Sequence, residues 1–115
     1  MADKQIEDLL LSLGIGHQYY GHRMIASAVQ RVIQDENNLL CLKSGILLPL
    51  ASLYNCSWYC IERNLRTAIR RAWRQNAPLL IQIAAFPMLN MPTVSEFIDI
   101  LASYIIRTNT LNYLM

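Results

Sequence analysis

Apolar residues recur at the helical period of 3.6 along most of this 115-residue chain. No stretch shows the strict alternation of apolar and polar residues that marks a half-buried strand. The spacing predicts helices over residues 3–13, 17–34, 50–54, 57–75 and 79–86, and a last helix that begins at Thr93. We therefore expect an all-α fold, a compact bundle of about six helices.

Capping residues mark several of the helix ends. Ser57 is the best N-cap in the chain, and Asn55 can end the preceding short helix in the left-handed conformation. Asn76 can close the helix that Ser57 begins. Thr93 and Glu96 have the spacing of a capping box.

Composition narrows the class of protein. Hydrophobic residues make up 54% of the chain and charged residues 16%, which excludes a disordered tail. The length suits one domain over residues 1–115. The longest apolar stretch, residues 79–91, is too short and too interrupted to span a bilayer, so we expect no membrane partner. With no signal peptide apparent and an odd count of three cysteines, we expect reduced thiols and a cytoplasmic location.

The distribution of arginine says more than the net charge of +2. Eight of the ten basic residues are Arg, and five of these lie between Arg63 and Arg74. On a helix over residues 57–75, Arg63, Arg66, Arg70 and Arg74 form one row about 16 Å long, opposite an apolar face. Nothing acidic interrupts this row, so we expect its partner to be an external anion.

The residues before this helix favour duplex DNA as that anion. A short helix over 50–54, a tight turn at 55–56 and a capped helix with a basic outer face are typical of a helix-turn-helix. We expect ten residues to bind DNA, with Ser57 at the helix start, Tyr59, Cys60, Glu62, Arg63, Arg66 and Thr67 closest to the bases, and Arg70, Arg71 and Arg74 at phosphates. The alternative is a solvated arginine face on a surface helix.

Other chemistry finds little support in the sequence. His17 and His22 do not share a helix face, and Cys56 and Cys60 have no further ligand at zinc spacing. Two packed free thiols are the favoured interpretation, with a redox role for Cys60 beside arginine as the alternative. No nucleophile–base–acid set and no glycine-rich phosphate loop is visible. We therefore expect neither an enzyme nor a bound metal or cofactor.

The segment LASLYNCSWYCIERNLRTAIRRAW over residues 50–73 resembles the helix-turn-helix of the C-terminal DNA-binding effector domain of the sporulation-initiation (stage-zero A) response regulators of endospore-forming bacteria. Leu13-Gly14-Ile15 and Pro92-Thr93 with the residues 95–98 fall at matching places. The resemblance covers residues 6–107.

The resemblance implies an all-α, six-helix domain that binds a short operator, often as tandem copies. It implies double-stranded DNA as the partner, with a second copy of the chain and RNA polymerase as further ones. Glu62, Arg63 and Arg66 stand where the family contacts DNA. Cys60 and Thr67 depart from the family's usual Arg and His.

A further departure is that residues 88–91 lack the cation of the family's basic loop. Another departure concerns the domain architecture, because the family places a receiver domain ahead of the effector domain. Because the chain starts at Met1, we expect no receiver domain ahead of this one. Three hypotheses follow: a sequence-specific transcription regulator, a protein-interaction module that kept the fold and lost operator binding, and a non-specific nucleic-acid binder that also takes RNA.

Overall fold

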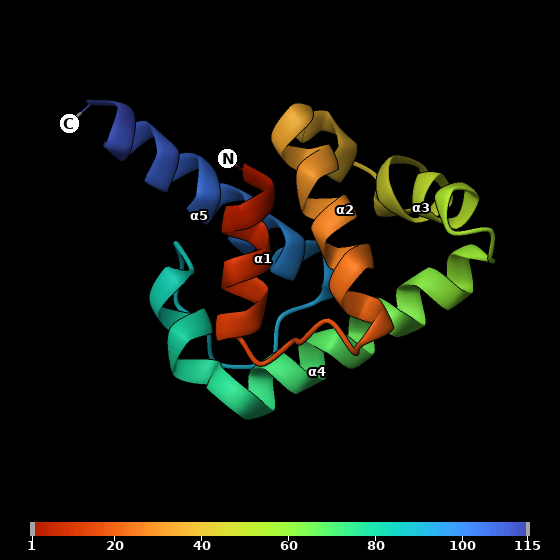
Figure 1. Ribbon diagram of the computed structural model, residues 1–115, viewed down its shortest axis with the longest axis horizontal. Coiled ribbons are helices and arrows are strands. Elements are labelled where there is room, and N and C mark those ends of the chain that lie inside the picture. The colour runs from red at the N-terminus through yellow and green to blue at the C-terminus, as the bar shows by residue number, and fades with distance from the viewer. Residues whose placement is uncertain (1, 115) are drawn as a thin grey trace.

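The computed structural model describes residues 2–114, with side chains over 3–110. Every regular element in that part of the chain is helical (Figure 1). The α-helices are α1 (Ala2–Ser12), α2 (Tyr20–Gln34), α3 (Leu48–Leu53), α4 (Trp58–Ile83) and α5 (Val94–Leu114). A 3-10 helix, η1 (Glu36–Leu39), and a π-helix, η2 (Lys43–Leu47), join α2 to α3. None of the described helices is long and apolar enough to cross a membrane.

The predicted fold class is confirmed. Five α-helices pack into a bundle with a radius of gyration of 13.3 Å. A kink at Asn76 divides α4 into two helical parts, which accounts for the sixth helix that the sequence predicts. The expected segments 57–75 and 79–86 therefore correspond to the two parts of α4.

Two helix boundaries differ from the prediction by three residues, and those of α1 and α3 differ by one or two. The second helix begins at Tyr20 and not at His17, because the Tyr19 N–H bonds to the carbonyl of Gly16 in a turn and Tyr19 itself is extended. The second part of α4 ends at Ile83 and not at Phe86, since Ala84 is already extended. Apolar residues thus continue past the end of α4 into the following loop.

The connection from α2 to α3 is tighter than the sequence suggests. At Gly45 a Cβ atom would collide with the carbonyl of Asn38, so only glycine fits inside the π-helix. The carbonyl of Gly45 accepts a hydrogen bond from Arg31 Nε of α2 at 2.9 Å. This arrangement holds α3 in place beside α2.

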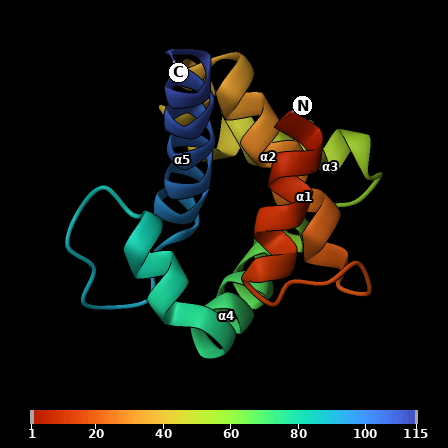
Figure 2. The same ribbon diagram turned by 60° about the vertical axis from the view of Figure 1, so that its left-hand side comes forward.

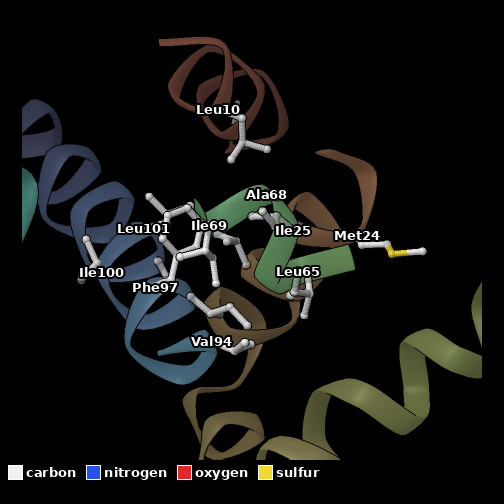
Figure 3. Close-up of a cluster of buried hydrophobic side chains, with 14 of the residues drawn as sticks. Leu10, Met24, Ile25, Leu65, Ala68, Ile69, Val94, Phe97, Ile100 and Leu101 are labelled. Atoms are coloured by element: carbon white, nitrogen blue, oxygen red, sulfur yellow. The ribbon is translucent and has the colours of Figure 1, made fainter. Parts of the chain in front are cut away.

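One face of α4 packs into the centre of the bundle. Figure 3 shows Ile69 of α4 beside Leu101 and Phe97 of α5, which are fully buried. On the other side, α2 crosses α4 at Gly21, where an added Cβ would lie 2.8 Å from both the Ala68 Cβ and the Asn64 carbonyl oxygen. The core thus fixes which face of α4 remains at the surface.

Candidate nucleic-acid interface

The turn between α3 and α4 has a defined backbone geometry. Asn55 is left-handed, with φ of 52°, as the sequence predicts. Its N–H bonds to the Ser52 carbonyl at 3.4 Å, and the Cys56 N–H bonds to the Ala51 carbonyl at 3.0 Å. These two bonds form a Schellman motif, which ends α3 and sets the direction in which the chain enters α4.

The start of α4 is capped as predicted. Ser57 is extended, and its Oγ accepts a hydrogen bond from the Cys60 N–H at 3.1 Å. The helix begins at Trp58, whose ring stacks on that of Tyr59 with centroids 4.8 Å apart. Lys43 of η2 lies over the Trp58 ring, 4.5 Å from its centroid, which adds a cation that the sequence pattern did not place here.

The other end of the basic segment is fixed by Asn76. Its backbone is non-helical, and its Oδ1 accepts a hydrogen bond from the Leu79 N–H at 3.3 Å, so it caps the second part of α4. Its Nδ2 donates to the carbonyl of Ser12 at 3.0 Å, which ties the kink to α1. The arginine row therefore lies entirely on the first part of α4.

All four arginines of the predicted row, Arg63, Arg66, Arg70 and Arg74, are exposed. The opposite face, including Ile61 and Leu65, is buried. One expectation was wrong, because the row has an internal acidic partner: Glu62 Oε2 lies 3.8 Å from Arg66 Nη2. An exposed pair at this distance contributes little to stability and is readily exchanged for another anion.

The outer face of α4 forms an open, shallow depression. Seven of the ten predicted DNA-binding residues line it together: Ser57, Tyr59, Cys60, Glu62, Arg63, Arg66 and Arg70. Thr67 and Arg74 are exposed but do not line it, and the Thr67 Oγ1 donates to the Arg63 carbonyl at 3.0 Å. The grouping puts polar side chains of several kinds on one accessible surface.

Arg71 lies apart from this surface. Its Nε donates to the Gly14 carbonyl at 2.8 Å, and its guanidinium carbon lies 4.6 Å from the centroid of the Tyr19 ring. The side chain is half-buried. Arg71 therefore ties α4 to the loop between α1 and α2.

A second depression lies beside the first and was not foreseen from the sequence. It runs between α4 and the first turn of α5 and has a volume of about 320 Å³. Arg66 and Arg70 line one side, and Met91 with the segment 92–95 lines the other. The capping box locates the α5 start, with Glu96 N–H to Thr93 Oγ1 at 3.2 Å and Thr93 N–H to Glu96 Oε1 at 2.8 Å, but its approach to α4 depends on tertiary packing.

The thiols differ in their surroundings. Hydrogen bonds from Ser44 hold the pKa of the exposed Cys41 thiol below its usual value. Burial raises the pKa of Cys56, and a hydrogen bond and charge repulsion from Cys60 raise it further. Among the described residues, no three His, Cys, Asp or Glu side chains come together as a metal site.

A short helix, a turn closed by left-handed Asn55 and a capped helix with a basic outer face, packed on the helices behind them, define a helix-turn-helix domain. A family model described as "Sporulation initiation factor Spo0A C terminal" matches residues 6–105. The chain belongs to this family, as the sequence resemblance indicates. Among curated proteins and among solved structures, none matches the chain.

The family assigns a general function. Its members are DNA-binding effector domains of sporulation regulators, so this chain is a DNA-binding regulatory domain, and the family is not one of enzymes.

Proposed function

We propose that this protein is a sequence-specific DNA-binding transcription regulator whose helix α4 enters the major groove of an operator in the cytoplasm. The observation that carries the proposal is the exposed row Arg63, Arg66, Arg70 and Arg74 on a helix that the α3–α4 turn presents at the surface. A basic second helix after such a turn is the element that helix-turn-helix proteins insert into DNA.

The dimensions suit this use. The row spans about 16 Å along the helix, and the major groove, about 12 Å wide, admits one α-helix. The N-terminal part of a recognition helix contacts the bases, which assigns Ser57, Tyr59, Cys60, Glu62, Arg63, Arg66 and Thr67 to the base edges. Arg63 and Arg66 suit guanine O6 and N7, and Glu62 suits cytosine N4.

Arg70 and Arg74 follow further along α4 and suit phosphate oxygens. Arg71, with its internal hydrogen bond to Gly14 and its contact with Tyr19, is assigned to holding α4 in place. Lys43, held over Trp58 beside the start of α4, is added as a phosphate contact. Tandem operator sites would bring a second copy of the chain alongside the first, and RNA polymerase is the further partner of a transcription regulator.

Binding is tested by fluorescence anisotropy on a duplex that carries the operator of the sporulation-regulator family and on a scrambled duplex. Titrations at about 50 mM and 200 mM salt give the salt slope. We expect tighter binding to the operator and a slope of several ions. Equal affinity for both duplexes, erased by salt, would reduce the protein to a non-specific binder, and a single-stranded RNA of the same length tests that outcome.

Two substitutions divide base reading from phosphate binding. Arg63→Gln should cost about 1–3 kcal/mol on the operator and relax the sequence preference, whereas Arg74→Gln should weaken binding to all sequences and lower the salt slope by about 1. Lys4→Gln is the charge-matched control, because Lys4 is exposed in the first turn of α1. The N-terminal end of α1 points away from α4 in Figure 1. Equal losses on both duplexes for Arg63→Gln and Arg74→Gln would contradict the division.

A second candidate function rests on the loop between α4 and α5. This loop bows out from the bundle (Figure 2) and exposes Phe86, Leu89 and Met91 to 39%, 90% and 41%. An exposed apolar loop favours contact with another protein. The second candidate is therefore a protein-interaction module that kept the fold and lost operator binding. Absence of DNA binding at low salt together with self-association in sedimentation analysis would favour this candidate, and Leu89→Ser should then abolish the association.

A further inference from the structure

Cys56 and Cys60 form a pair of thiols at the start of α4. Cys56 lies just before the N-cap Ser57. The Ser57 Oγ accepts a hydrogen bond from the Cys60 N–H. Burial raises the pKa of the Cys56 thiol, and the neighbouring Cys60 side chain raises it further. Cys56 packs against the core while Cys60 lines the surface depression with Arg63, so the pair connects the interior to the proposed DNA-binding face.

Both members of the pair are held by further hydrogen bonds. The Cys56 N–H donates to the Ala51 carbonyl at 3.0 Å in the turn. Asn64 Nδ2 donates to the Cys60 carbonyl at 2.8 Å and also lies 3.5 Å from the Cys60 Sγ. The turn and the Ser57 cap thus order the backbone around both cysteines, which lie at the same end of α4, so a bond between their sulfur atoms would restrict little further freedom.

We propose that Cys56 and Cys60 are a modification site, at which hydrogen peroxide forms an intramolecular disulfide that weakens DNA binding by α4. The Cys60 thiolate attacks peroxide, releases hydroxide and becomes a sulfenic acid. The Cys56 sulfur then attacks the Cys60 sulfur, and the departing hydroxyl leaves as water. Overall, two thiols and one hydrogen peroxide give one disulfide and two water molecules.

The order of these steps follows from the surroundings of each thiol. Burial and the neighbouring Cys60 raise the pKa of Cys56, so Cys60, which lines the open depression, is the first to react. The new bond draws the Cys60 sulfur toward Cys56 and away from the depression it shares with Tyr59 and Arg63. The effect on DNA rests on the proposed function, whereas formation of the disulfide does not.

The test uses the full chain with Cys41→Ser, which removes the exposed third thiol. The protein is treated with hydrogen peroxide, and mass spectrometry of the peptide that spans Cys56 and Cys60 follows its oxidation. We expect a loss of two hydrogen atoms and a single linked peptide. Operator affinity should fall by about tenfold, the size of one lost base contact, and return on reduction with dithiothreitol.

A matched variant separates the disulfide from general oxidation. Cys41→Ser with Cys56→Ser leaves Cys60 in place and should keep its operator affinity after the same treatment and reduction cycle, with only reversible sulfenic acid at Cys60. In the Cys41→Ser protein, which keeps both thiols, formation of sulfinic acid or of links between chains without the internal disulfide would overturn the proposal. So would an internal disulfide that leaves operator affinity unchanged. If the reduced protein binds no DNA, the proposed function fails while the mass measurement still decides whether the disulfide forms.

Discussion

The crossing of α2 over α4 leads to a prediction that can be worked out atom by atom. In Gly21→Ala, the new methyl group would lie 2.8 Å from the Ala68 Cβ and 2.8 Å from the Asn64 carbonyl oxygen. Both neighbours belong to the buried side of a helix, and neither is the end of a flexible side chain. The two helices must therefore move apart, and overpacking of this kind costs about 1–3 kcal/mol.

Helix propensity opposes this cost. Gly21 is the second residue of α2, so its replacement by alanine gains at most about 1 kcal/mol. Because the clash involves a backbone carbonyl, we place the strain near the upper limit, and the net loss is about 2 kcal/mol in the free energy of unfolding. For a chain of this size, the midpoint of thermal unfolding should fall by about 8 °C.

The assay is denaturation followed by circular dichroism, and a second variant supplies the control. Ala68→Gly alone should cost about 1 kcal/mol through helix propensity. When it is combined with Gly21→Ala, the double variant should be more stable than the sum of the two losses predicts, because one of the two clashes is gone. A Gly21→Ala protein more stable than the parent would refute the reasoning, since propensity would then outweigh contact.

Three further predictions concern the turn between α3 and α4, the hydrogen bond from Arg71 to the loop after α1, and the thiols. Asn55→Ala should lower the free energy of unfolding by about 1 kcal/mol because φ is 52°, whereas Asn55→Gly should not, and urea denaturation compares them. Arg71→Gln should lose about 1 kcal/mol of stability yet keep operator affinity within about twofold in anisotropy, and a loss as large as that of Arg63→Gln would return Arg71 to the interface. With iodoacetamide at neutral pH, Cys41 should react first, because its lowered pKa gives more thiolate, and Cys56 last; equal rates in mass spectrometry would contradict both pKa shifts.

The sequence predicted local features well. The Ser57 cap, the left-handed Asn55 and the Thr93–Glu96 capping box each depend on a few neighbouring residues, and all three are present. The buried face of α4 followed from its apolar period. Such features need no knowledge of how distant segments meet.

Contacts between segments far apart in the chain could not be predicted from the pattern of apolar and polar residues. Arg71 lies close to the row on a helical wheel, yet its hydrogen bond to Gly14 joins positions far apart in the chain. The start of α5 beside Arg66 likewise depends on packing in three dimensions. The π-helix at 43–47 departs from the 3.6-residue period on which the prediction of helices relied. Its close approach to Asn38 is a backbone contact, which the pattern of side chains does not indicate.

The tie between Arg71 and the loop after α1 has a consequence for how this domain could be redesigned. The acceptor is the main-chain oxygen of Gly14, and Asn76 likewise bonds to the main-chain oxygen of Ser12. Main-chain acceptors are present whatever side chains the neighbouring positions carry. The orientation of α4 is thus set by atoms that a library of variants at Cys60, Arg63 and Thr67 would leave untouched, so the outer face of α4 could be varied on an unchanged scaffold.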